Sequence, residues 1–255
     1  MAYAPHVAHN TLANLMRSPQ DTQPFVTLDC VIFGFAEGSL QVLLVEWTEP
    51  GNPQLWALPG GFLKEDTDLD TSAQIVLEGL TGVAHVFMEQ LHTFGKVSRV
   101  PTHRAITITY YALVAPAQYP LKPGPDNRKV KWFDIREIPG LIYDHREILE
   151  SGLEHLRKKI REEPIGFELL PQKFTLTQIQ CLYESILNGP IDKRNFRKKF
   201  LNMNLLTPLE EMQQGVAHRA ARLYSFDKEV YETLKAEKKL NFDFKLLDEE
   251  EGGED

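Results

Sequence analysis

Cysteine is scarce in this chain, and long apolar runs are missing. Its 255 residues include two cysteines, Cys30 and Cys181, which lie far apart and each within an apolar segment. This arrangement excludes a disulfide framework or a zinc site, so we expect two buried thiols. No apolar run is long enough to span a membrane, and the first residues lack the charged-then-apolar layout of a secretory signal. We therefore expect a cytoplasmic protein without a membrane partner.

An overall positive charge is also missing, because the formal net charge is −8. Taken alone, this balance argues against nucleic acid as a partner. The charge is unevenly distributed, however: residues 173–222 hold eight basic side chains against four acidic ones, a local charge of +4. Local asymmetry matters more for partners than the global sum. The length and the 42% apolar composition suit two domains with a sizeable core.

The first part of the chain predicts an α/β sandwich over residues 25–162, preceded by a loosely attached arm at 1–24. Apolar residues at helical spacing predict helices at about 69–80 and 145–160. Proline and glycine make residues 162–171 the expected linker. Segments rich in β-branched and aromatic residues predict strands at 25–35, 40–47, 55–58, 86–94, 105–114 and 129–133.

The second part predicts a winged helix over residues 163–245. Thr175 and Gln178 form a capping box that begins one helix, and Asp192 is a good N-cap for a second helix at 193–202. Two helices joined by a tight turn make a helix-turn-helix. A basic hairpin after it would be the wing, and residues 246–255 would form a solvated acidic tail.

The second helix carries the sequence KRNFRKK at 193–199, five cations around one aromatic residue. Such a helix can enter the major groove of DNA, where arginine and asparagine bond base edges and lysine suits phosphates. The expected base contacts are Arg194, Asn195 and Arg197. The expected phosphate or minor-groove contacts are Lys193, Lys198, Lys199, Arg219 and Arg222. The alternative is a solvated basic helix face.

Residues 60–83, GGFLKEDTDLDTSAQIVLEGLTGV, resemble the Nudix box, the segment in which Nudix hydrolases hold Mg²⁺. The glycines and the closing Thr-Gly-Val remain, but Thr67, Val76, Gly79 and Leu80 stand where the box has glutamates. A hard cation needs carboxylate oxygens. We therefore predict no metal site, no cofactor and no catalytic residue. Positions 76, 79 and 80 share one helix face, which we expect to extend an apolar stripe packed on the core.

A family resemblance covers roughly residues 25–227. The segments FTLTQIQCLYESI and DKRNFRKKF, with DCVIFGF, LPGGF, MEQLHTFG and LIYDH upstream, resemble the Nudix-related transcriptional regulators of bacteria. This resemblance implies a Nudix-like effector domain, a C-terminal winged helix, an operator in double-stranded DNA and a homodimer. It also implies a small-molecule effector, either ADP-ribose or, in a second branch, a sugar such as arabinose. The decayed box favours the sugar branch.

The effector site is predicted from chemistry, because a sugar needs planar hydrogen-bond donors and an aromatic face. The loop SRVPTHR at 98–104 departs from the Arg-Asp-Pro pattern of the family, with Val100 in place of the acid. Ordinary packing is the alternative for each candidate. The candidates are Arg99, His103, Arg104, Tyr143 and His145, with Trp56 and Phe62 as walls.

These features predict a transcriptional regulator whose catalytically inactive Nudix-like domain senses a sugar or a sugar nucleotide. One rival is an active Nudix hydrolase of ADP-ribose or a related nucleoside diphosphate sugar, which the missing glutamates disfavour. The other rival is an adaptor whose winged helix binds protein, which a salt-independent partner would favour.

Overall fold

The computed structural model describes residues 24–49, 52–124, 128–163, 165–215, 219–237, 244 and 246–247. The expected N-terminal arm lies outside these residues except for Pro24, and so does the acidic stretch 248–255. None of the helices in the described ranges is both long and apolar enough to cross a membrane.

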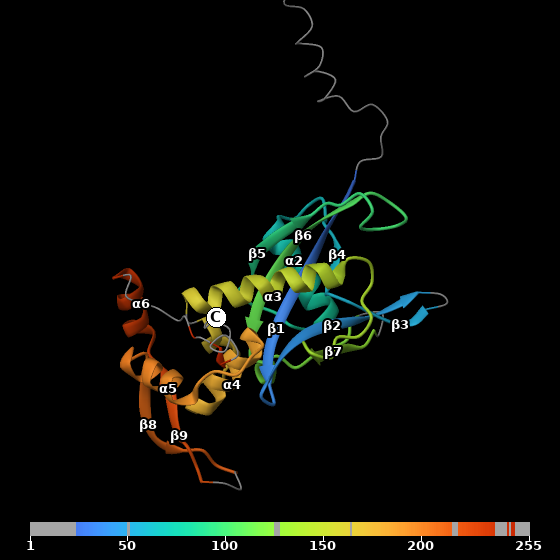
Figure 1. Ribbon diagram of the computed structural model, residues 1–255. Coiled ribbons are helices and arrows are strands. Elements are labelled where there is room, and N and C mark those ends of the chain that lie inside the picture. Colours follow the sequence, from blue (N-terminus) through green and yellow to red (C-terminus); the bar gives the residue numbers. More distant parts are fainter. Residues whose placement is uncertain are drawn as a thin grey trace, which may run out of the picture.

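Seven strands of the first part form one sheet in the order β3-β2-β1-β6-β5, with β4 paired to β1 and β7 paired to β2 (Figure 1). The central pair, β1 and β6, is parallel, whereas the other pairs are antiparallel. The strands are β1 (Phe25–Ala36), β2 (Ser39–Glu49), β3 (Asn52–Ala57), β4 (Gly60–Phe62), β5 (Glu89–Phe94), β6 (Ala105–Val114) and β7 (Val130–Asp134).

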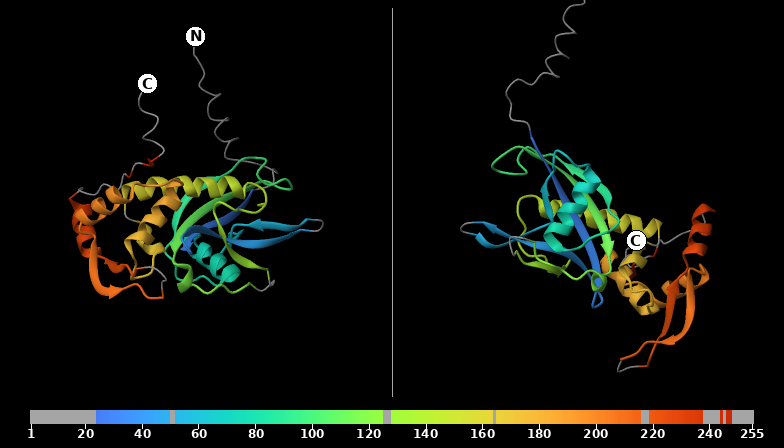
Figure 2. Two further views of the ribbon diagram at one scale, coloured as in Figure 1. Left: turned by 60° about the horizontal axis from the view of Figure 1, so that its bottom comes forward. Right: turned by 180° about the vertical axis from the view of Figure 1, so that it is seen from behind.

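Helices α2 (Leu69–Thr81) and α3 (His145–Glu162) cover opposite faces of this sheet (Figures 1 and 2). Alternation along β1 explains the two layers, because successive side chains of a strand point to opposite faces. Leu28, Cys30 and Ile32 share a buried cluster with α2, whereas Val31 and Phe33 share one with α3. The predicted α/β sandwich is confirmed, and a short 3-10 helix, η1 (Pro116–Gln118), follows β6.

The second part is the predicted winged helix, and it lies beside the sheet (Figure 2). The capping box of α4 is present: the Thr175 hydroxyl accepts the Gln178 N–H at 3.2 Å, and the Gln178 side chain accepts the Thr175 N–H at 2.8 Å. The Asp192 carboxylate caps α5 by accepting the Asn195 N–H at 2.7 Å. Its elements are η2 (Ile165–Leu169), α4 (Leu176–Leu187), α5 (Lys193–Asn202), β8 (Leu206–Met212), β9 (Arg222–Phe226) and α6 (Lys228–Ala236). Helix α6 was not predicted.

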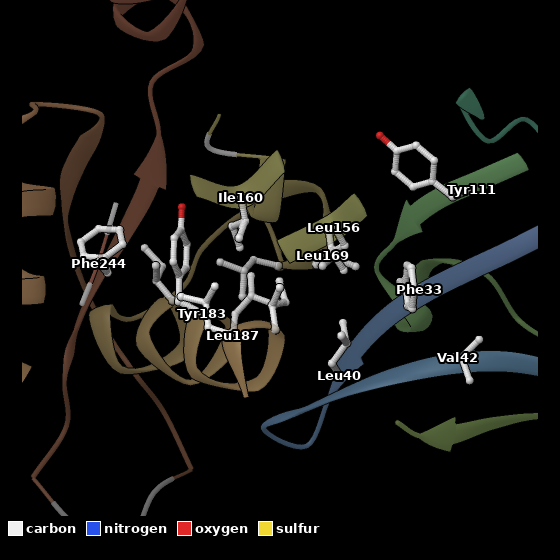
Figure 3. Close-up of a cluster of buried hydrophobic side chains, with 14 of the residues drawn as sticks. Phe33, Leu40, Val42, Tyr111, Leu156, Ile160, Leu169, Tyr183, Leu187 and Phe244 are labelled. Carbon is white, nitrogen blue, oxygen red and sulfur yellow. The ribbon is translucent and has the colours of Figure 1, made fainter. Parts of the chain in front are cut away.

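The segment expected to be a linker is part of a core shared by both halves. Leu169 and Leu170 are buried in the same apolar cluster as Ile160 of α3 and Leu182 of α4. Figure 3 shows this cluster continuing from the sheet into the helix-turn-helix. The linker prediction is therefore wrong for these residues, because Ile165–Leu169 form the 3-10 helix η2, whose Gly166 and Leu169 are buried.

Two smaller expectations change as well. Cys30 is buried as expected, but Cys181 on α4 is only half-buried. Leu246 and Leu247, which we expected to begin the tail, contact the turn between α4 and α5. Leu246 forms an isolated antiparallel bridge with Ile191, and the Leu247 N–H donates to the Pro190 carbonyl at 3.0 Å.

Candidate functional site

The helix face that carries metal ligands in a Nudix box lies outside the core here. Val76 and Leu80 are half-buried, and Gly79 is exposed. Val76 faces the glycine loop, since a Cβ on Gly61 would lie 3.3 Å from Val76 Cγ2. The expected apolar stripe is therefore wrong at these positions, because they lie beside the buried side of α2 and not on it. The buried positions of α2 are Ser72, Ala73, Leu77 and Thr81.

This face does not fit a divalent cation. Valine, glycine and leucine offer no oxygen ligand, and the Thr67 hydroxyl is hydrogen-bonded to Ser72. Mg²⁺ prefers several oxygen ligands in near-octahedral geometry. Within the described ranges, no group of three or more His, Cys, Asp or Glu residues is arranged to hold a metal ion.

A buried polar cluster lies close to the glycine loop. Arg99 donates to both oxygens of Asp144, from Nε at 2.9 Å and from Nη2 at 3.0 Å. The same Nη2 lies 3.6 Å from Asp29 Oδ2, which also accepts the Thr107 hydroxyl at 2.7 Å. These contacts tie β1, β6, the loop before β6 and the start of α3 together. The cluster therefore holds the loop before β6 against β1 and the start of α3.

His145 completes this cluster as a neutral imidazole. The Leu58 N–H donates to Nδ1 at 3.0 Å, so Nε2 carries the proton and points toward Asp29 Oδ1 at 3.7 Å. Burial lowers the pKa of His145, and the nearby carboxylates of Asp29 and Asp144 only partly oppose that effect. Gly60 is required beside the cluster, since a Cβ there would lie 2.1 Å from Asp29 Oδ1.

Four of the residues predicted to bind the effector make contacts within the protein. Arg99 and His145 are only 6% and 5% exposed. The Trp56 ring packs edge-on against Phe133 at 4.6 Å between centroids. Arg104 Nη1 donates to the Gly95 and Lys96 carbonyls, at 2.8 and 3.0 Å. These side chains hold loops and packing in place.

The other three candidates are more accessible. Phe62 is 59% exposed and stands edge-on to Phe25 at 5.6 Å, and His103 stands edge-on to the same Phe25 at 5.0 Å. Phe25, Phe62 and His103 thus form an aromatic group on the surface at the end of β4. Tyr143 is 45% exposed and lies elsewhere, 6.5 Å from the His145 ring. Phe62 and His103 thus share a contact with Phe25, Arg99 and His145 both approach Asp29, and Tyr143 lies near His145.

Helix α5 has an apolar inner face and a basic outer face. Phe196 and Phe200 are fully buried and pack edge-on against Tyr183 of α4, at 5.4 and 5.3 Å between centroids. The exposed side chains of its first turns are Lys193, Arg194, Asn195 and Lys198.

The remaining candidates for DNA contact differ in accessibility. Arg197 is half-buried, its Nη2 donates to Thr177 Oγ1 at 3.0 Å, and its Nε has no hydrogen-bond partner among the described residues. Lys199 is half-buried and lies over the Phe244 ring at 4.7 Å. Arg219 and Arg222, which flank the start of β9, are exposed.

Several residues in these sites were missed from the sequence. Asp29 did carry a signal, because a lone acid inside the buried strand FVTLDCVIF needs a partner. Asp144, next to the predicted His145, carried a weaker one. Phe25 begins a predicted strand, and Phe244 lies in a segment for which no element was predicted, so the contacts of both appear only in the folded chain.

A degenerate Nudix-like sandwich joined to a winged helix with a basic second helix defines a class of protein, the Nudix-related transcriptional regulators. Comparison with known proteins supports this class. The family model described as the NrtR DNA-binding winged helix domain matches residues 166–226. A protein of Acinetobacter baylyi described as the ADPR responsive transcriptional repressor NtrR is 30% identical over 82% of this chain and 84% of its own length.

Solved structures agree. The crystal structure of Shewanella oneidensis NrtR in complex with a 27mer DNA is 29% identical, covers 81% of this chain and 95% of its own, and has a TM-score of 0.68. A MutT/nudix family protein from Enterococcus faecalis, 24% identical with a TM-score of 0.64 over 88% of this chain and 94% of its own, shares the fold. The chain belongs to the NrtR family of Nudix-related transcriptional regulators.

Proposed function

We propose that this protein is a transcriptional repressor that binds operator DNA through α5 and responds to ADP-ribose through its Nudix-like domain. The observation that carries the proposal is the two-faced helix α5, whose aromatic side is buried while its first turns present lysine, arginine and asparagine to solvent. This is the arrangement with which a recognition helix enters the major groove. The missing glutamates favour a sensor over a hydrolase.

The accessible residues divide by chemistry. Arg194 and Asn195 lie in the first turn and suit bidentate bonds to guanine and adenine edges. Lys193 and Lys198 suit phosphates, and the exposed Arg222 of β9 suits the backbone or the minor groove. Arg197 is better suited to holding α5 on α4, because its guanidinium is bonded to Thr177.

ADP-ribose is preferred to a free sugar on the strength of a relative. The Acinetobacter baylyi repressor, with 30% identity, is described as responsive to ADPR, whereas the relatives reported above give no support to the sugar branch that the decayed box favoured. A free sugar stays the second candidate because the metal site is missing. Without a metal ion, the pyrophosphate of ADP-ribose must be held by N–H groups and cations, whereas a free sugar has no pyrophosphate to hold.

The aromatic group of Phe25, Phe62 and His103 offers a place for the adenine. Stacking of one nucleobase on an aromatic side chain is worth about 1–3 kcal/mol. Phe62→Ala should therefore weaken ADP-ribose binding about five- to 150-fold. Phe87→Ala is the matched control, because Phe87 is 78% exposed and lies before β5.

The effector test is a thermal-shift panel of ADP-ribose, ribose and arabinose, with and without Mg²⁺. ADP-ribose should raise Tm without Mg²⁺, since a ligand at 100 times its Kd adds about 2.7 kcal/mol to stability. Linkage also applies to the two ligands: the factor by which ADP-ribose changes operator affinity must equal the factor by which the operator changes ADP-ribose affinity. A response to arabinose alone would establish the sugar branch instead.

The DNA test begins with selection of sites from a pool of random duplexes, followed by fluorescence anisotropy of the full chain. A specific regulator should prefer the selected site to a scrambled one by about 10³–10⁷. Enrichment of no sequence would contradict the proposal. We also propose a homodimer on two half-sites one helical turn apart, which sedimentation of the free and DNA-bound chain tests.

A further inference from the structure

A cavity of about 1030 Å³ lies between the two halves of the molecule. One side is formed by the end of β6 and the helix η1, and the other side by η2, β9 and α6. Lys235 of α6 lies 3.6 Å from Glu163, which brings α6 to the end of α3 (Figure 1). Ligand pockets measure about 300–1,000 Å³ and occur preferentially at domain interfaces. The cavity therefore has the size and the place of a ligand site.

Half-buried aromatic rings line the side of the cavity that belongs to the winged helix. Phe167 of η2 stacks on Phe226 of β9, with 4.0 Å between the ring centroids, and Tyr231 of α6 lies 5.7 Å from Phe226. All three residues line the cavity. An aromatic ligand can pack beside these rings, and a cation can lie over a ring face.

The charged residues of the lining carry one more negative than positive charge. Four glutamates and three lysines line the cavity, which gives a charge of −1. Each lysine has an acidic neighbour in the lining. The neighbours are Glu89 for Lys159, Glu163 for Lys235 and Glu232, one turn further along α6, for Lys228.

Glu168 is the acid that remains. It follows Phe167 in η2, and it makes no hydrogen bond or ion pair with any other residue that the structure describes. Desolvation in the cavity wall raises the pKa of the Glu168 carboxyl, and the positive charge of Lys159 only partly opposes that effect. A cation bound in the cavity would stabilise the charged carboxylate beside the aromatic rings.

We propose that this cavity binds a small aromatic molecule with a positive charge, whose ring packs beside Phe167 and Phe226 and whose ammonium group pairs with Glu168. Tyr111 and Leu113 of β6 would lie on its other side. None of the residues assigned above to the effector or to DNA lines this cavity. The inference therefore goes beyond the proposed function and does not depend on it.

Three indoles of similar size are suitable probes. Tryptamine carries an ammonium group, tryptophol a neutral hydroxyl group and indole-3-acetate a carboxylate. Ligands of this size bind proteins with a Kd of about 1 mM, so methyl chemical shifts of the full-length chain are followed up to about 10 mM of each probe. Tryptamine should bind about five- to tenfold more tightly than tryptophol, because an ion pair with a partly exposed carboxylate contributes that factor. Indole-3-acetate should bind most weakly.

Intermolecular NOEs locate the bound probe. The indole protons of tryptamine should give NOEs to the methyl groups of Leu113 and Ile165, which line the cavity from opposite halves of the molecule. The variants Leu113→Ile and Ile165→Val assign these signals. Absence of binding up to the highest concentration, or NOEs only to methyl groups outside the lining, would overturn the proposal.

The variant Glu168→Gln tests the role of the carboxylate, because it keeps the shape of the side chain and removes its charge. It should bind tryptamine and tryptophol equally and keep the wild-type affinity for tryptophol. Glu154→Gln is the matched control, since Glu154 is an exposed acid of α3 outside the lining, and it should keep the preference for tryptamine. Equal binding of the three probes to the wild type would overturn the charge of the proposed ligand. A preference that survives in Glu168→Gln, or that Glu154→Gln removes as well, would overturn the role of Glu168.

Discussion

The buried ion pair of Arg99 gives the sharpest test of the Nudix-like domain, through the variant Arg99→Met. The side chains of Arg99, Asp29 and Asp144 are 3%, 7% and 11% exposed, and Arg99 makes two charged hydrogen bonds to Asp144. Methionine fills much of the volume but leaves two carboxylates without their cation. Removing one partner of a buried pair costs about 3–5 kcal/mol.

For a chain of this size, that loss corresponds to a fall in Tm of about 6–20 °C. Differential scanning calorimetry, with urea unfolding alongside, measures it. Arg136→Met is the matched control, because Arg136 also pairs with an aspartate, Asp134, but its side chain is 69% exposed. We expect this control to keep the wild-type Tm, since surface pairs contribute little.

The double variant Arg99→Met with Asp144→Asn should recover part of the loss, because it removes one uncompensated charge. A free energy of unfolding within about 1 kcal/mol of wild type for Arg99→Met would refute the structural role. If that variant instead loses only its response to ADP-ribose, Arg99 is an effector ligand, as the sequence alone suggested.

Three further predictions concern α5, the Nudix-like helix and pH. Arg194→Ala should weaken operator binding by about 1–3 kcal/mol and relax discrimination at one base pair in anisotropy titrations. Arg197→Ala should mainly lower Tm. The reverse pattern would show that Arg197 contacts the base and that Arg194 holds α5 in place. Neither the wild type nor Val76→Glu should hydrolyse ADP-ribose in ³¹P NMR assays with Mg²⁺, because one carboxylate does not make a magnesium site, and turnover that chelation abolishes would contradict this. Burial holds the pKa of His145 below its usual value near 6.5, so the unfolded chain binds this proton more readily and stability falls as pH drops below about 6.5. His145→Asn, which keeps an acceptor for the Leu58 N–H, should lose less Tm than wild type between pH 7.5 and 5.5, and parallel losses would argue against a buried neutral His145.

Local patterns in the sequence were sufficient for much of the fold. Helix α2 was predicted because its apolar residues recur at helical spacing, and α4 because Thr175 and Gln178 cap it. Strands β1 and β2 were predicted because β-branched and aromatic residues are concentrated in both segments. Each of these signals lies within a few residues of the chain.

The sites depended on contacts between distant segments, which such patterns do not record. Arg99 was expected to face a ligand, but it meets Asp144, which lies 45 residues away. Arg197 was expected to read a base, but its guanidinium donates a hydrogen bond to Thr177 on the neighbouring helix. Both expectations treated a cation as free, because its acceptor lay in a different predicted element. The aromatic contacts of Phe244 are remote in the same way.

The core that continues from α3 into α4 makes α3 a common wall for both halves of the molecule. Unfolding of either half would expose to water the apolar side chains of the other half that pack against it, which costs free energy. We therefore expect amide hydrogens in α4 and α5 to open together with those of the sheet, as one cooperative unit. A small molecule that stabilises the sheet would then also slow hydrogen exchange in the distant helix that carries the basic face.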